Sequence, residues 1–193
     1  MPRPSSARLA LQGGAGGGDR LGFRVVTEEA RLRRLGAGEG RKLLLLGDVR
    51  TVKAGGAETG GELAIVEQAV EPGASSALHR HAYREVFYVL EGELEFAGLE
   101  GGEHVAFLAG AGDAVHAPPW AAHAYRNRGG RRARFLAVMQ PAGADGFFEE
   151  AGVWLGEDGE VPAGAATPSP EEVREAAARH GIEFLPGGRA FRR

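Results

Sequence analysis

Short runs in which apolar and polar residues alternate fill the middle of the chain, from Lys42 to Met139. Alternation with a period of two places successive side chains on opposite faces of an extended strand. Glycines, prolines and polar residues separate these runs at short intervals, which is typical of an all-β sandwich or barrel. We therefore expect strands over residues 43–46, 49–53, 62–70, 85–91, 93–97, 104–108, 113–117, 123–127 and 133–139.

Helical patterns flank this region on both sides. Residues 27–35 begin with Thr27 as a candidate N-cap, carry acids in the first turn and arginines in the last, and so predict a short helix. Near the C-terminus, Ser169 with Glu172 three residues later forms a capping box with proline at the first helical position. This predicts a helix that runs to about His180, with a shorter helical segment expected over residues 145–150.

The change of pattern along the chain suggests three parts. Residues 1–22 are rich in glycine and offer too little apolar surface to offset the entropy of ordering, so a flexible leader is expected. Residues 23–141 should form the β-barrel with its lead-in. Residues 142–193 should form a helical extension that packs on the barrel, with residues 182–185 as a short apolar contact.

Composition narrows the class of protein. A length of 193 residues with 43% hydrophobic and 25% charged residues suits one globular domain with tails. The net charge of −3 gives no electrostatic attraction to nucleic acid or to an anionic membrane. Without a long apolar run or a signal-peptide pattern, we expect a cytoplasmic protein. The absence of cysteine excludes disulfides and thiolate metal sites.

Four side chains stand out as candidate metal ligands. His79 and His81 are two residues apart, so on a strand they point to the same face, and Glu85 follows shortly after. A later strand offers His123 as a third imidazole. Three imidazoles and a carboxylate suit one divalent transition metal (Fe, Ni, Mn, Co, Cu or Zn) and leave coordination positions open. The alternative is that the strand histidines are structural or surface residues.

The spacing of these residues resembles the two sequence motifs of the cupin superfamily. The first block reads Gly73-x5-His79-x-His81-x3-Glu85-x6-Gly92, and the second reads Gly112-x5-Pro118-x4-His123-x3-Asn127. The resemblance implies a double-stranded β-helix, or jelly-roll barrel, with a metal held by His79, His81, Glu85 and His123. One position departs from the family pattern, because Trp120 stands where the second motif usually has a glycine.

A narrower resemblance rests on residues 85–93, on Pro141-Ala142-Gly143 before residues 147–150, and on a late helix that ends over residues 177–183. These features are similar to bacterial single-domain cupins grouped with quercetin dioxygenases. The resemblance implies a mononuclear, O2-dependent dioxygenase acting on a small aromatic or enolisable substrate. Two alternatives stay open: a non-redox metal isomerase or cyclase, and a cupin that binds a small ligand without turnover.

Two further expectations concern the surroundings of the metal. Glu85 is either a static ligand or also the catalytic base that removes a proton from the substrate. The strand period makes several residues candidates for a substrate pocket, although plain barrel core is the alternative; they are Phe87, Tyr125, Phe135 and Met139, with Trp120 near the mouth. Because the family commonly pairs through edge strands, and residues 43–46 would be an exposed apolar strand, we also expect a homodimer.

Overall fold

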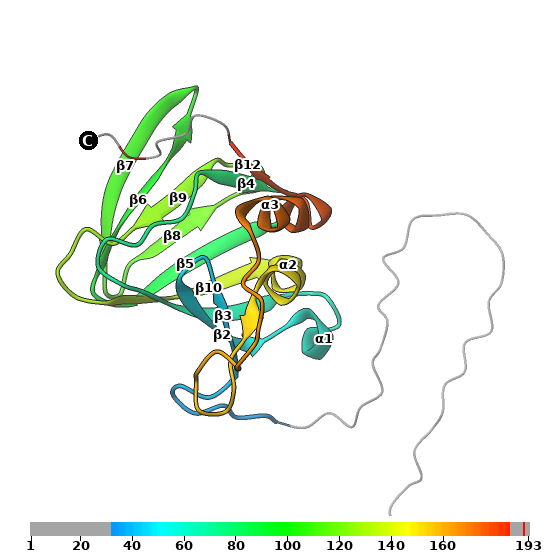
Figure 1. Cartoon of the computed structure of the whole chain (residues 1–193). Coiled ribbons are helices and arrows are strands. Elements are labelled where there is room, and N and C mark those ends of the chain that lie inside the picture. The colour runs from blue at the N-terminus through cyan, green and yellow to red at the C-terminus, as the bar shows by residue number, and fades with distance from the viewer. Residues whose placement is uncertain (1–31, 186–190, 192–193) are drawn as a thin grey trace, which may run out of the picture.

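The protein is described here by a computed structural model, which covers residues 32–185 and residue 191. Two antiparallel β-sheets form the body of this part of the chain (Figure 1). In spatial order, the seven-stranded sheet contains β11 (Val153–Trp154), β1 (Arg41–Leu45), β2 (Asp48–Ala54), β3 (Ala64–Val70), β10 (Ala133–Gln140), β5 (Arg84–Glu91) and β8 (Ala114–Ala117). The five-stranded sheet contains β12 (Ile182–Phe184), β4 (His79–His81), β9 (His123–Arg126), β6 (Glu93–Glu100) and β7 (Glu103–Gly110).

The inward faces of the two sheets enclose one hydrophobic core. Residues of β5 and β10 in the first sheet meet residues of β6 and β9 in the second, as the ring-centroid distances of 5.2 Å between Phe87 and Phe96 and 5.1 Å between Tyr125 and Phe135 show. Every second residue of β3 and of β10 is buried, which is the period expected for strands with one face inside. The all-β jelly-roll barrel predicted from the sequence is therefore confirmed.

Three helices accompany the sheets in the described residues: α1 (Gly56–Thr59), α2 (Ala144–Ala151) and α3 (Pro170–Arg179). Figure 1 shows α2 and α3 side by side against the barrel. Ser169 and Glu172 form the predicted capping box, and Gly181 after the helix has a φ of 69°, which favours glycine. None of the helices among residues 32–185 has the length and apolar character that crossing a membrane requires.

The N-terminal part differs from expectation in two respects. The helix expected over residues 27–35 lies mostly outside the described residues, as does the Gly-rich leader of residues 1–22, and residues 32–35 are not helical. Residues 43–46 do not form the exposed apolar strand expected to pair two chains, because Leu43 and Leu45 are buried within the chain; the homodimer itself stays a prediction. The outer edge of β1 pairs with β11, a short strand of the C-terminal extension.

Candidate metal centre

The four candidate ligands come together at one point between the two sheets. β4 provides His79 and His81, β5 provides Glu85, and β9 provides His123, which lies directly opposite His79 in the β4–β9 ladder. One potential ligand atom from each of the four side chains lies within 4.8 Å of the corresponding atom of the others. His81, Glu85 and His123 are buried, and His79 is partly buried.

Backbone carbonyl groups fix the orientation of all three imidazoles. The Nδ1 atoms of His79, His81 and His123 lie 2.8, 3.0 and 2.9 Å from the carbonyl oxygens of Ala77, Tyr83 and Ala121. A carbonyl oxygen can only accept, so each Nδ1 carries the proton and donates. The Nε2 atom of each neutral ring is then left with a free lone pair, which is the form that binds a metal.

The Nε2 atoms of His81 and His123 face a carboxylate oxygen of Glu85, so acceptor atoms face one another, and a positive charge between them would stabilise the arrangement. The Oε2 atom of Glu85 lies 3.0 Å from Nε2 of His81 and 3.4 Å from Nε2 of His123. Nε2 of His123 is buried and has no hydrogen-bond partner in the described part of the chain. Lone pairs of neutral imidazoles directed at a carboxylate oxygen repel it unless a proton or a metal ion lies between them.

The separations also suit a metal. With metal–ligand bonds of about 2.1 Å, neighbouring ligand atoms of an octahedral or tetrahedral site lie roughly 3.0 to 3.4 Å apart. The Glu85–His81 and Glu85–His123 distances fall in this range. The residues present therefore fit one divalent metal ion, with His79, His81, Glu85 and His123 as the groups that would hold it.

The electrostatics of the cluster favour the ligand forms of His79 and Glu85. Burial, together with the charge of His123, lowers the pKa of His79 to about 3, so this ring is neutral at ordinary pH. Burial alone would raise the pKa of Glu85, but its contacts with His123 and His81 outweigh that effect and lower the pKa to about 2. Burial opposes protonation of His123 as well, yet the nearby carboxylate of Glu85 raises its pKa.

Local features of the sequence explain why these strands bring the ligands together. Period two along β5 places Glu85, Phe87 and Val89 inside, as the buried pattern of that strand shows. Gly98 of β6 lies opposite His123, and a Cβ atom at this position would lie 2.6 Å from the carbonyl oxygen of Ala122. Glycine at position 98 therefore permits the close approach of the backbone that immediately precedes His123.

The ring of Tyr83, between β4 and β5, supports the candidate metal centre from one side. The Tyr83 ring stacks on the His81 ring with their centroids 3.6 Å apart and their planes 6° from parallel. Tyr83 is itself buried, and burial raises the pKa of its hydroxyl far above the usual range, so the hydroxyl is neutral. This stacking leaves the His81 ring little freedom to rotate.

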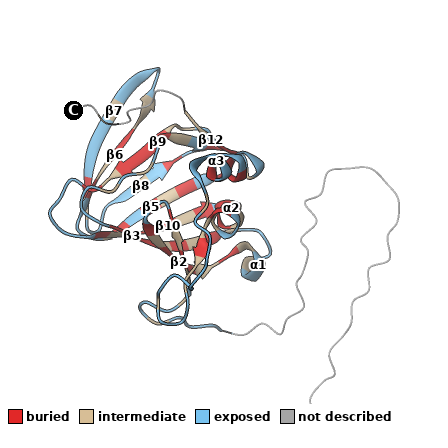
Figure 2. Cartoon of the chain, in the orientation of Figure 1, coloured by how far each residue is buried: buried red, intermediate tan, exposed pale blue. Residues whose placement is uncertain are grey.

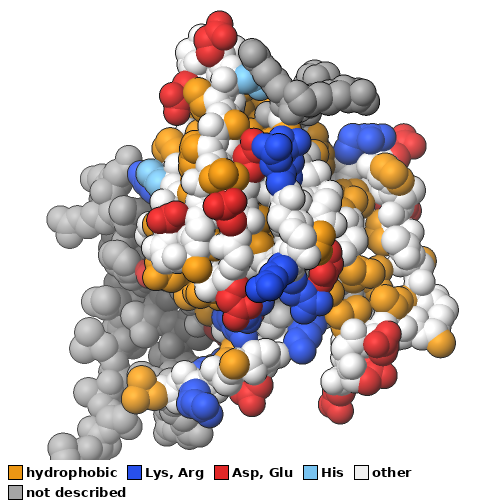
Figure 3. All heavy atoms as spheres, turned by 90° about the vertical axis from the view of Figure 1, so that its left-hand side faces the viewer, with side chains coloured by type: hydrophobic (Ala, Val, Ile, Leu, Met, Phe, Trp, Pro, Cys, Tyr) orange, Lys and Arg blue, Asp and Glu red, His pale blue; other side chains and the backbone are white. Residues whose placement is uncertain are grey.

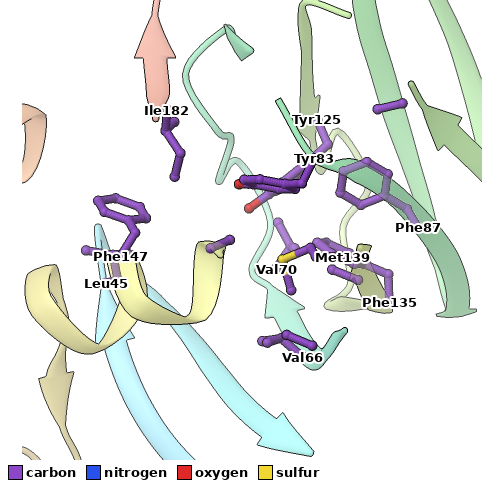
Figure 4. Close-up of a cluster of buried hydrophobic side chains, with 14 of the residues drawn as sticks. Leu45, Val66, Val70, Tyr83, Phe87, Tyr125, Phe135, Met139, Phe147 and Ile182 are labelled. Carbon is purple, nitrogen blue, oxygen red and sulfur yellow. The ribbon is translucent and has the colours of Figure 1, made fainter. Parts of the chain in front are cut away.

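A cavity of about 70 Å³ adjoins the centre. His79, Tyr83 and Glu85 line it on the metal side, and its apolar wall includes Phe147 of α2 and Ile182 of β12. Figure 4 shows the hydroxyl ends of Tyr83 and Tyr125 directed toward the side where Phe147 and Ile182 lie. The C-terminal extension thus closes the cavity against the barrel.

The structure separates the five residues expected to line a substrate pocket. Tyr125 lines the cavity, whereas Phe87, Phe135 and Met139 are buried in the hydrophobic core and lie outside its lining (Figure 4). Trp120 is 52% exposed and does not line the cavity either. Its φ of 66° lies in the left-handed region that favours glycine, which accounts for the glycine usual at this motif position.

Sequence reasoning missed several polar residues of the cavity: Asp48, Arg50 and Gln68, on the neighbouring strands β2 and β3. All three are buried. The sequence does contain an indication of this. Arg50 is two residues from Val52 on β2, and Gln68 is two residues from Val66 and Val70 on β3, so each polar side chain points to the same face as its apolar neighbours. A charged or amide side chain on the buried face of a predicted strand is unusual and indicates a functional or structural polar group.

One family of known proteins matches the central part of the chain. Residues 66–139 match the family model described as a cupin domain, and this range contains all four candidate ligands. The two-sheet barrel and the site able to hold a metal are consistent with this match. No curated protein matches the chain significantly.

Solved structures that resemble the chain include oxalate decarboxylase from Bacillus subtilis. Its structure at pH 4.6 is 24% identical over the aligned part, with a TM-score of 0.48, and the match covers 52% of this chain and 27% of that one. A second structure of the same enzyme, from work on its Mn(II) centres, is also 24% identical, with a TM-score of 0.45 and coverage of 49% and 26%. The present chain thus matches only about a quarter of the length of these structures.

Proposed function

We propose that the protein is a metal-dependent cupin enzyme of the dioxygenase type, which acts on a small enolisable substrate. The observation that carries the proposal is the position of Glu85, whose Oε2 faces the Nε2 atoms of two histidines beside a cavity that the same residue lines. A carboxylate in that position can serve as a ligand and can also accept a proton from a bound substrate.

The roles of the residues follow from their contacts. A bound divalent metal supplies Lewis-acid polarisation of a substrate oxygen, and a redox-active one also allows reaction with O2. Glu85, whose pKa is lowered to about 2, is ionised but weakly basic, so it could take the proton of an enol at a carboxylate oxygen where a bound metal makes that enol more acidic. Burial raises the pKa of Tyr125 to about 12, so its neutral hydroxyl can donate a hydrogen bond to a substrate oxygen.

The size of the cavity favours a compact substrate. Pockets for drug-sized ligands commonly have volumes of roughly 300 to 1,000 Å³. The cavity beside the metal site measures about 70 Å³, so a small enol, diketone or oxo acid suits it better than a three-ring flavonol. The quercetinase-like resemblance is therefore retained for the type of reaction and not for the substrate.

The test begins with elemental analysis of the purified protein, followed by reconstitution of the metal-free form with Fe, Mn, Co, Ni, Cu or Zn. O2 uptake is then measured with small diketones and oxo acids and, for comparison, with flavonols. We expect about one metal per chain and uptake that is lost in Glu85→Gln and His79→Gln. His104→Gln serves as the matched control, because His104 is exposed on β7, away from the candidate ligands.

Other outcomes would lead to the two alternatives. Turnover of the same compounds with Zn and without O2 would indicate a non-redox isomerase or cyclase. A tightly held ligand recovered unchanged, with no turnover under any condition, would indicate a binding module. Absence of metal binding by the wild-type protein would contradict every version of the proposal.

A further inference from the structure

The cavity contains a buried positive charge that the metal chemistry does not use. Arg50 on β2 is only 7% exposed. Its Nη1 donates a hydrogen bond to the carbonyl oxygen of Leu45 at 2.7 Å, but its Nε is buried and has no hydrogen-bond partner among the described residues. A buried N–H group without an acceptor is unfavourable, and an oxygen atom of a ligand would remove that penalty.

The neighbours of Arg50 form a polar strip along the cavity. Arg50 lies opposite Gln68 in the β2–β3 ladder, so the two side chains are cross-strand neighbours on the inward face. The amide of Gln68 donates to the carboxylate of Asp48 at 2.9 Å and to the hydroxyl of Tyr125. The guanidinium lies over the ring of Phe148, 5.1 Å from its centroid.

Two charges near the cavity bear on what Arg50 can attract. Asp48 already accepts the hydrogen bond of Gln68, and burial raises the pKa of its carboxyl group, although the charge of Arg50 opposes that shift. On the other side, His79 and Glu85 line the same cavity at the metal site. An anion in the cavity would thus meet a guanidinium at one contact and a metal ion at another.

We propose that Arg50 is the anion-recognition residue of the cavity, and that the substrate is a compact carboxylate with a second oxygen donor for the metal, such as a 2-oxo or 2-hydroxy acid. The proposal deepens the proposed function and rests on it for the metal end of the substrate. Arginine suits this role because its planar guanidinium binds carboxylates with well-defined geometry. The cavity of about 70 Å³ limits the acid to a few carbon atoms.

Calorimetric titration with two matched ligands tests the proposal on the unaltered protein. Pyruvate carries a carboxylate and a carbonyl oxygen, and pyruvamide replaces the carboxylate by a neutral amide of the same shape. With Ni(II)-loaded protein, we expect pyruvate to bind at least about tenfold more tightly than pyruvamide. Equal binding of the two ligands, or no binding of pyruvate, would overturn the role of Arg50.

Two variants locate the effect. Arg50→Lys keeps the charge but removes Nε, and Gln68→Glu places a carboxylate beside an intact Arg50 with almost no change in shape. We expect each to weaken pyruvate binding at least about tenfold, with little effect on pyruvamide. Arg132→Lys is the control, because Arg132 pairs with Glu71 at the surface. Wild-type pyruvate affinity in a folded Arg50→Lys or Gln68→Glu protein would contradict the proposal.

The same titration on metal-free protein separates this inference from the proposed function. If Arg50 recognises the carboxylate, pyruvate still binds the metal-free protein in preference to pyruvamide, although more weakly. A protein that binds no metal but keeps this preference would disprove the proposed metal enzyme and leave the role of Arg50 intact. A protein that binds metal but does not prefer pyruvate to pyruvamide would disprove the role of Arg50 and leave the proposed metal enzyme intact.

Discussion

His81 lies directly opposite Ile182 in the ladder between β4 and β12, so a candidate metal ligand pairs with a strand from the C-terminal extension. The next two pairs of the ladder join Arg80 to Glu183 and His79 to Phe184. An ion pair of 2.7 Å between Arg80 and Glu183 reinforces the contact at the surface. The extension thus supports the ligand strand along the edge that β9 leaves free.

Ile182→Ala should therefore weaken the metal centre as well as the fold. Ile182 is 4% exposed and belongs to the main core, so truncation should lower the free energy of unfolding by about 2 to 5 kcal/mol. We also expect weaker metal binding, because β12 holds β4 in place. Denaturant unfolding and competition with a metal chelator measure the two effects. Val161→Ala, at an exposed position, is the control, and unchanged metal affinity in Ile182→Ala would show that β12 does not position the ligands.

Local patterns made much of the barrel predictable. Strand boundaries such as those of β5 and β10 follow from period two, and the helix α3 follows from the Ser169 capping box and Gly181. The pairings of β11 with β1 and of β12 with β4 could not be read from the chain, because they join short segments far apart in sequence. Arg50 could not be predicted as a cavity residue for a different reason: an arginine is ordinarily exposed, and its burial becomes evident only once that face of β2 is known to point inward.

Gly98→Ala should disturb the centre from the strand next to His123. The added methyl group would lie 2.6 Å from the carbonyl oxygen of Ala122, a backbone atom that can move only together with its strand. We expect a loss of stability of about 1 to 3 kcal/mol and weaker metal binding, since His123 follows Ala122 directly. Gly130→Ala is the matched control, because no atom lies within 4 Å of the Cβ position there. If Gly98→Ala binds metal as the wild type does, the close approach is not needed to position His123.

Glycine in place of Trp120 should give a more stable protein than alanine, although alanine is usually the more stabilising of the two residues. Trp120 has a φ of 66°, and a residue other than glycine in this region carries about 1 to 2 kcal/mol of strain. The backbone is held there by the hydrogen bond from Trp120 N–H to the carbonyl oxygen of His81, at 2.7 Å. We therefore expect Trp120→Gly to be more stable than Trp120→Ala by about 1 kcal/mol, as measured by denaturant unfolding. A more stable alanine variant would mean that the strain is absent.

The contact between α2 and α3 should make stability depend on pH in acid. Glu150 accepts hydrogen bonds from Arg179 at 2.8 Å and from His180 at 2.7 Å, and these contacts lower the pKa of its carboxyl group below 4.5. The unfolded chain then binds the proton more readily, so the contribution of Glu150 is present above pH 4.5 and is lost as the pH falls through the lower, folded value. We expect Glu150→Gln to have a lower melting temperature than the wild type near pH 6, with a difference that shrinks as the pH falls below 4.5. A difference that persists unchanged at pH 3 would show that charge is not the cause; Glu157→Gln is the control.

Self-association should involve β7, the outer strand of the five-stranded sheet. Most of β7 is exposed (Figure 2), and the neighbouring Phe107 and Leu108, which point to opposite faces, are 49% and 56% exposed. Figure 3 views this side of the molecule and shows hydrophobic side chains among charged ones. In the part of the chain that the structure describes, β7 pairs only with β6, and an unpaired strand edge with apolar residues favours pairing with another chain, so we propose that β7 joins two copies.

Light scattering of the wild-type protein should then give about twice the chain mass of 20.2 kDa. Phe107→Lys combined with Leu108→Lys should give the monomer mass, because two buried lysines per chain would oppose the interface and charges on an edge strand discourage pairing. Leu46→Lys, at another exposed apolar position, should leave the mass unchanged. A wild-type monomer would refute the proposal outright, and a dimer that survives the β7 double substitution would place the interface elsewhere on the molecule.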